Sequence, residues 1–178
     1  MLKSEARIKA REFRKNLSLD DRRTKDEIIK ETFFALPEVN SAKNICVYIS
    51  ARDEVSTIEI INTLLSSGKT LSAPKTDGDI MYALEFTGWD NCKIGNFKIV
   101  EPTGKRVDER LCDLIVVPLV AFNKDKARIG YGKGYYDKFL PKGVKTVGLA
   151  YAGQCFDFEP ESFDKSLDLI VTEKGVVR

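Results

Sequence analysis

The sequence contains no histidine, and this absence limits its chemistry more than any other feature of its composition. A chain without histidine has neither the Ser-His-Asp and Cys-His arrangements that activate nucleophiles nor any histidine-ligated metal site. We therefore expect any catalysis to depend on carboxylates, lysine, arginine, tyrosine or backbone amides.

Cysteine is also scarce and widely dispersed. The four cysteines form no C-x-x-C pair, and they are Cys46, Cys92, Cys112 and Cys155. This spacing supports neither a zinc knuckle nor a dithiol redox motif. We interpret the cysteines as isolated thiols of the core.

No apolar run approaches the roughly 20 residues that a membrane-spanning helix requires. The N-terminal segment MLKSEARIKAREFRKNLS lacks the apolar stretch of a secretory signal, and Glu5 and Glu12 are atypical of a transit peptide. The sequence therefore predicts a cytoplasmic protein with no membrane partner.

The chain has no strong excess of charge of either sign. Lysine and arginine number 29 and the acidic residues 27, which leaves a net charge of +2. Binding to a nucleic-acid backbone usually requires a marked positive excess, so we expect no nucleic-acid partner. The length of 178 residues fits one domain spanning residues 1–178, and we expect a monomer.

Two amphipathic helices are predicted at the N-terminus. Apolar residues recur every three or four positions from Leu2 to Leu17, which is typical of one helical face. Ser18 and Asp21 then form a capping box for a second helix, which continues until Pro37.

Short β-rich runs follow, alternating with helical segments. The runs are NICVYIS, TLSAPK, MYALEF, CDLIVVPLVAF, KTVGLAY and LDLIVT. Continuous apolar stretches such as LIVV are typical of central strands covered on both faces, and a helix over residues 58–65 joins the first two runs as a βαβ unit. The prediction is a three-layer α/β/α sandwich with a mainly parallel central sheet and an N-terminal helical pair.

The segment ARIGYGKGYYDKFL, residues 127–140, lies just beyond one of these apolar runs. Ligands of open α/β sheets collect at the carboxyl ends of the strands. Its three glycines permit positive φ angles and an amide nest for an anion, and Arg128 and Lys133 add positive charge.

This segment matches neither of the common nucleotide-binding patterns. No serine or threonine follows Lys133, as a Walker loop requires, and Tyr135 stands where a dinucleotide fingerprint has its last glycine. From spacing alone, phosphate binding and a plain glycine-rich turn between strand and helix both stay open.

The segment RIGYGKGYYDKFL closely resembles the signature of the 5-formyltetrahydrofolate cyclo-ligase family. The resemblance covers nearly the whole chain and includes Lys3 and Arg7, YISARDEVST, IVEP at residues 99–102, DLIVVPLVAF and SLDLIVTE. It implies a ligase that uses ATP and Mg²⁺ to convert 5-formyltetrahydrofolate to 5,10-methenyltetrahydrofolate, with release of ADP and phosphate. The formyl oxygen would be phosphorylated first and N10 would then attack, a chemistry that needs positioning and charge neutralisation rather than histidine.

The resemblance also implies roles for individual residues. Lys133 and Arg128 are the expected catalytic residues. The expected ATP-binding residues are Lys3, Arg7, Arg128, Gly130, Gly132, Lys133, Gly134, Tyr135 and Tyr136. The expected folate-binding residues are Ile49, Glu54, Tyr131, Gly132, Lys133, Gly134 and Tyr135. Asp137 and Asp168 match the magnesium ligands.

Without the resemblance, simpler readings of several residues stand. Asp137 is then a carboxylate in the first turn of a helix, Asp168 an outward residue of a strand and Glu54 a solvated loop carboxylate. Lys3 and Arg7 are then part of a solvated basic face.

Two other functions stay open from the sequence. One is an isomerase that binds a sugar phosphate at the same glycine-rich loop, and the other is a non-catalytic sensor of nucleotide or folate. The paired aspartates argue against a metal-free isomerase, and Lys133 beside Tyr135 favours a transferred phosphate near an aromatic ligand.

Overall fold

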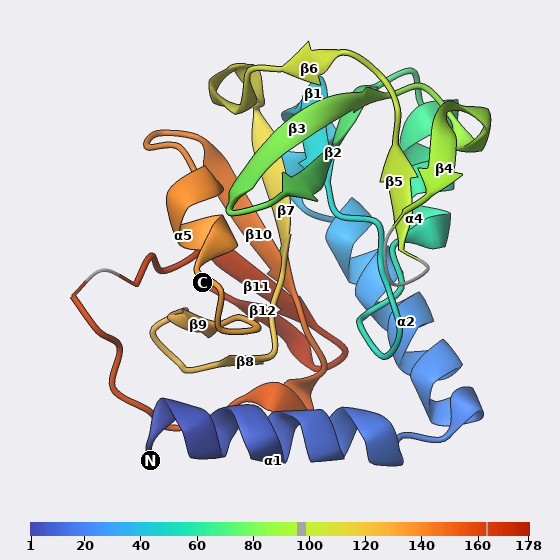
Figure 1. Ribbon diagram of the computed structural model, residues 1–178. Helices are drawn as coiled ribbons and strands as arrows, with labels where there is room; N and C mark the ends of the chain where they lie inside the picture. The colour runs from blue at the N-terminus through green and yellow to red at the C-terminus, as the bar shows by residue number, and fades with distance from the viewer. Residues whose placement is uncertain (96–98, 163) are drawn as a thin grey trace.

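The structure is a computed structural model that describes residues 1–95, 99–162 and 164–178, and its centre is an eight-stranded sheet (Figure 1). The strand order is β12-β11-β10-β7-β1-β2-β3-β6. The strands are β1 (Asn44–Val47), β2 (Thr70–Asp77), β3 (Ile80–Phe86), β6 (Arg106–Val107), β7 (Leu114–Pro118), β10 (Lys145–Leu149), β11 (Leu169–Thr172) and β12 (Gly175–Val177). The pairs from β11 across to β2 are parallel, whereas β12, β3 and β6 pair antiparallel at the edges. The predicted mainly parallel sheet is confirmed.

Helices cover both faces of this sheet, and two of them form the N-terminal pair. The helices are α1 (Lys3–Asn16), α2 (Leu19–Phe34), α3 (Pro37–Ser41), α4 (Ile58–Ser66) and α5 (Tyr135–Phe139). Ile45 and Val47 of β1 pack into a core with residues of α2, α3 and α4, while Cys46 between them packs into a second core that includes Phe139 of α5. This alternation follows from the period of a strand and produces the predicted layers. Among the described residues, no helix combines the length and apolar character needed to cross a membrane.

The second helix begins and ends close to its predicted limits. The Ser18 side chain accepts a 3.0 Å hydrogen bond from the backbone N–H of Asp21, which caps α2. Ile29 and Phe33 are fully buried. Pro37 does not end this helix but begins the next, α3, where its missing N–H has no cost.

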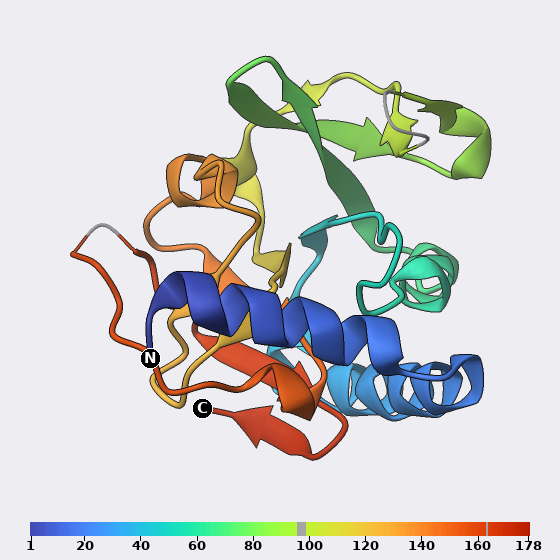
Figure 2. The same ribbon diagram turned by 60° about the horizontal axis from the view of Figure 1, so that its bottom comes forward.

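The first helix buries much of its predicted apolar face, with the exception of Leu2, and it also buries a charged residue outside that face. Leu2 is 68% exposed, whereas Ala6, Ala10 and the guanidinium of Arg14 are buried. α1 packs against β8 (Ala121–Phe122) and the 3₁₀ turn η4 (Ala152–Gln154), and it lies across one side of the molecule in Figure 2. Since β8 and η4 follow β7 and β10, α1 crosses the carboxyl ends of the parallel strands.

The four cysteines are free, but they do not all lie in the core. Cys46 and Cys112 are buried, Cys92 is partly buried and Cys155 is exposed. The prediction of core thiols therefore holds for Cys46 and Cys112 and is wrong for Cys155, which follows η4 at the surface.

Candidate active site

A cavity of about 1250 Å³ opens at the carboxyl ends of β1, β2 and β7. Ile49 follows β1, Thr76 lies near the end of β2 and Pro118 ends β7, and all three line the cavity. In the sheet, β2 is the neighbour of β1 on one side and β7 is its neighbour on the other side. The cavity therefore lies at the point where the direction of strand addition reverses, which is where open α/β sheets bind ligands.

The glycine-rich loop forms one wall of this cavity. It joins β9 (Arg128–Ile129), which pairs with β8, to α5. Gly132 and Gly134 have φ angles of +99° and +66°, which explains why the loop requires glycine at these two positions. α5 has only five residues, so its dipole adds little to the site.

Arg128 lies at the base of this wall as a buried cation. Its side chain is 4% exposed, and its guanidinium donates a 2.6 Å hydrogen bond to the Asp137 carboxylate. Nε of Arg128 is buried and has no hydrogen-bond partner among the described residues. Burial lowers the pKa of Arg128, although the group stays protonated at neutral pH. An anion in the cavity would supply the partner that this buried donor lacks.

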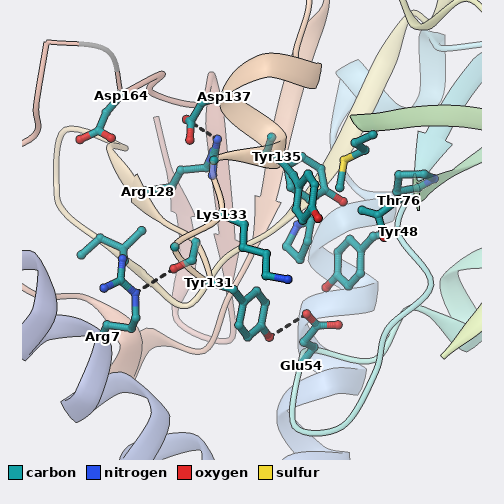
Figure 3. Close-up of a pocket in the computed structure, with 18 of the residues that line it drawn as sticks. Arg7, Tyr48, Glu54, Thr76, Arg128, Tyr131, Lys133, Tyr135, Asp137 and Asp164 are labelled. Atoms are coloured by element: carbon teal, nitrogen blue, oxygen red, sulfur yellow. Dashed lines mark hydrogen bonds and ion pairs between the residues drawn. The ribbon is translucent and has the colours of Figure 1, made fainter. Parts of the chain in front are cut away.

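Lys133 extends from the loop into the cavity (Figure 3). Its side chain makes no hydrogen bond or ion pair with the residues that the structure describes, and its Nζ lies 6.0 Å from the centre of the Tyr135 ring. The charge of Lys133 is therefore available to an anionic ligand.

Helix α1 contributes two further cations, Lys3 and Arg7. Arg7 Nε donates a 3.0 Å hydrogen bond to the carbonyl of Gly130, and Lys3 Nζ lies 2.6 Å from the carboxylate of Asp164. Both cations line the cavity. The basic flank of α1 is thus part of the cavity wall and not a solvated face.

Glu54 and Tyr131 form the opposite part of the site. The Tyr131 hydroxyl donates a 2.8 Å hydrogen bond to Glu54 Oε1, and the backbone N–H of Ala51 donates to Oε2 (Figure 3). Burial raises the pKa of Glu54 above its ordinary value. Ile49 and the buried Tyr48 lie nearby on the same wall.

The other two tyrosines of the loop have different positions. The Tyr135 hydroxyl donates a 2.6 Å hydrogen bond to the carbonyl of Gly78, at the tip of the β2–β3 hairpin, and so closes one side of the cavity. Tyr136 lines the cavity but also packs edge-to-face on Phe139, and burial raises its pKa well above the ordinary value.

The two aspartates expected to hold Mg²⁺ do not lie together. Asp137 lines the main cavity, whereas Asp168 lines a separate cavity of about 550 Å³. Asp168 immediately precedes β11, and its carboxylate accepts 2.8 and 2.9 Å hydrogen bonds from the backbone N–H and the hydroxyl of Thr146, near the start of β10. In a parallel sheet the amino ends of the strands lie at one end of the sheet and the carboxyl ends at the other. Asp168 therefore lies away from the main cavity, and the expectation that Asp137 and Asp168 share one magnesium site is corrected.

The second aspartate of the main cavity is Asp164 and not Asp168. It lines the main cavity, its side chain is 8% exposed, and its charge acts on Arg128, the partner of Asp137. Asp164 lies four residues before Asp168. Since Asp168 stands at the start of the run LDLIVT and ligands collect at the carboxyl ends of strands, the sequence carried an indication against Asp168. The described residues contain no group of three or more cysteine or carboxylate side chains that could hold a metal ion by itself.

Sequence reasoning also missed the contribution of the β2–β3 hairpin. Lys75, Thr76 and Met81 line the cavity. Ligands of open α/β sheets collect at the carboxyl ends of strands, and this applies to the end of β2 as well, so TLSAPK carried a usable indication.

Known proteins match this chain over nearly its full length. The model of the 5-formyltetrahydrofolate cyclo-ligase family matches residues 2–173. A 5-formyltetrahydrofolate cyclo-ligase from Haemophilus influenzae is 31% identical over 168 residues, which cover 88% of each chain.

Solved structures agree with the sequence comparison. The NMR structure of 5,10-methenyltetrahydrofolate synthetase from Aquifex aeolicus superposes with a TM-score of 0.89 and 36% identity, covering 100% of this chain and 93% of that one. A 5,10-methenyltetrahydrofolate synthetase from Mycoplasma pneumoniae has a TM-score of 0.81 and 26% identity, covering 97% and 99% of the two chains.

Proposed function

Because the chain belongs to the 5-formyltetrahydrofolate cyclo-ligase family, we propose that its main cavity binds ATP beside α1 and the glycine-rich loop, and 5-formyltetrahydrofolate beside Glu54. The chain is an enzyme with 5-formyltetrahydrofolate cyclo-ligase activity, and ATP use follows from its family. The observation that best supports the proposed placement is one large cavity with cations on one wall and a tyrosine–carboxylate pair on another.

The ATP phosphates are the anion that the cationic wall requires. Lys3, Arg7 and Arg128 surround the part of the cavity next to Gly130, and Arg128 has a buried N–H donor without a partner among the described residues. Gly132 and Gly134 bear no side chain that would block a close approach of phosphate to the backbone. Lys133 would compensate the charge that spreads over the transferred phosphoryl group.

The folate is placed on the opposite wall. The carboxylate of Glu54 can accept hydrogen bonds from pterin N–H groups, because each of its oxygens keeps a lone pair after bonding to Tyr131 or Ala51. Ile49 and the tyrosine rings provide apolar surface for a flat ring.

The residues present fit a magnesium site that is completed by phosphate. Mg²⁺ usually takes one or two protein carboxylates together with substrate phosphates and water. We propose Asp137 and Asp164 as these carboxylates, with Asp164 in place of Asp168. Bound Mg²⁺ would neutralise charge on the phosphates of ATP.

In the reaction, the formyl oxygen attacks the γ-phosphorus of ATP and ADP leaves. N10 then attacks the formyl carbon and loses its proton to solvent, and phosphate leaves as the methenyl bridge forms. The protein holds the two substrates in contact and stabilises the transferred charge through Lys133 and Arg128, without a protein nucleophile. The sequence predictions of a monomer and a cytoplasmic location stay predictions.

An absorbance assay tests this proposal. Protein mixed with 5-formyltetrahydrofolate, ATP and Mg²⁺ should produce the near-ultraviolet absorbance of the conjugated methenyl product, together with ADP and phosphate. Omitting ATP or chelating the metal should stop the increase. A sensor would bind without accumulating product, and a sugar-phosphate isomerase would not use folate, so no product above the enzyme-free control would contradict the proposal.

A further inference from the structure

Arg14 is a buried cation on α1 that does not line the main cavity. The residue is 1% exposed, and its Nε is buried without a hydrogen-bond partner among the described residues. A buried guanidinium stays charged, so its burial is costly unless its remaining donors are well partnered. The identity of those partners indicates what this charge does.

The partners of Arg14 lie beside the folate wall. Its Nη2 atom donates hydrogen bonds of 2.8 Å to Asp53 Oδ1 and 3.1 Å to the Tyr131 hydroxyl, and its Nη1 atom is 3.5 Å from the carbonyl of Leu119. Asp53 is the neighbour of Glu54 in the chain, and Tyr131 is bonded to Glu54. One guanidinium thus joins α1, the loop after β1 and the glycine-rich loop.

The direction of these hydrogen bonds follows from the chemistry of the groups. Arg14 can only donate, so the Tyr131 oxygen accepts from it. The single phenol proton is then free to point at Glu54 Oε1, 2.8 Å away. The cation also draws electron density from the phenol oxygen, which strengthens this second hydrogen bond.

Glu54 is therefore held from three directions. Tyr131 holds Oε1, the backbone N–H of Ala51 holds Oε2, and the Arg14–Asp53 ion pair fixes the preceding residue. Partial burial raises the pKa of Glu54, and the positive charge of Arg14 favours its ionised form. Only the ionised form has both oxygens free to accept hydrogen bonds.

We propose that Arg14 is a positioning residue for the folate side of the reaction, which orients Tyr131 and Asp53 so that Glu54 presents a fixed carboxylate to the pterin. The proposal rests on the proposed role of Glu54 in binding folate. The side-chain partners of Arg14 are Asp53 and Tyr131, both next to Glu54, so its effect should fall mainly on folate.

The test compares the parent enzyme with Arg14→Met, Arg14→Lys, Tyr131→Phe and the Arg14→Met/Tyr131→Phe double variant. Lys15→Met is the matched control, because Lys15 follows Arg14 on α1 but is exposed. The measurements are kcat, the KM values for 5-formyltetrahydrofolate and ATP, and the melting temperature.

We expect KM for folate to rise about tenfold in Arg14→Met and in Tyr131→Phe, in line with the loss of one hydrogen bond to a charged group. KM for ATP should stay within about twofold, Arg14→Lys should recover part of the loss, and Lys15→Met should match the parent. The double variant should be little worse than either single variant, since residues acting through one another are not additive.

A fall in melting temperature with no change in KM for folate would assign Arg14 a purely structural role and overturn the proposal. Full additivity in the double variant would do the same. If Arg14→Met does not fold, Tyr131→Phe and Arg14→Lys still decide the question. A parent protein without turnover would instead count against the proposed function, and calorimetric binding of 5-formyltetrahydrofolate to the same variants would then test the positioning role.

Discussion

Arg7 and Gly130 are 123 positions apart, yet Arg7 Nε donates a 3.0 Å hydrogen bond to the carbonyl of Gly130. This contact ties the first helix to the glycine-rich loop at the point where the loop leaves β9. Lys3, one helical turn earlier, forms an ion pair with Asp164, in the segment that precedes β11. The first helix is thus a structural part of the cavity wall. Removing its cations should raise KM for ATP more than KM for folate.

Arg7→Ala should raise KM for ATP about ten- to a hundredfold, because a charge-assisted hydrogen bond contributes about 1.5–3 kcal/mol. KM for folate should change much less. Lys9→Ala, an exposed change on the same helix, is the matched control. Equal losses for the two substrates would indicate that the helix has detached or the protein has misfolded.

Lys133→Ala should lower kcat by about 10²–10³-fold, the usual effect of removing one preorganised group that stabilises transferred charge. The fold should persist, since Lys133 is exposed and makes no hydrogen bond or ion pair within the described part of the chain. Steady-state kinetics and circular dichroism measure the two effects. Lys138→Ala removes an exposed lysine nearby on α5 and should leave kcat unchanged, and a similar kcat in both variants would remove Lys133 from the catalytic step.

Magnesium titrations should separate the three candidate aspartates. Asp137→Asn and Asp164→Asn should each raise the concentration of Mg²⁺ required for half-maximal activity by about tenfold or more, since each removes a charged ligand. Asp168→Asn should leave the titration unchanged and lower only the melting temperature, through its lost bonds to Thr146. A shift in Asp168→Asn with none in Asp164→Asn would contradict the placement of the metal.

Folate binding should weaken at acidic pH because Glu54 must be ionised to accept hydrogen bonds. The titratable or charged groups that act on Glu54 are Arg14, Tyr48, Asp53, Tyr131 and Tyr136. Burial raises the pKa of Glu54, so KM for folate should increase as the pH falls through this raised pKa, at a higher pH than that at which an exposed glutamate loses its charge. In Glu54→Gln, KM for folate should be higher and should depend much less on pH, and an equally steep dependence in that variant would exclude Glu54 as its origin.

The same pKa shift has a consequence for stability. The folded state binds the Glu54 proton more tightly than the unfolded state does. Above the raised pKa of Glu54 its ionised side chain therefore lowers the free energy of unfolding, whereas below the ordinary pKa of glutamate the residue is protonated in both states and has no such effect. Glu54→Gln should therefore melt at a higher temperature than the parent at neutral pH, and this gain should vanish at acidic pH. Thermal melts of both proteins from neutral to acidic pH measure this gain. A difference in melting temperature that stays constant with pH would contradict a raised pKa at Glu54.

The sequence by itself determined the first two helices, the central strands and the family. The helix cap at Ser18 and the apolar runs of the central strands depend only on neighbouring residues, so local patterns were sufficient to predict them. The glycine-rich segment is also local, and its distinctive composition carried most of the resemblance.

The tertiary structure decided which charged residues meet. Asp164 and Asp168 are four positions apart, but Asp164 lines the main cavity, whereas Asp168 lies at the amino end of β11 and lines a different cavity. No sequence pattern singled out Arg14, yet the docking of α1 on β8 and η4 buries it beside Tyr131. Such pairings depend on strand direction and on how helices pack, and both follow from contacts between distant segments, which no short window of sequence contains.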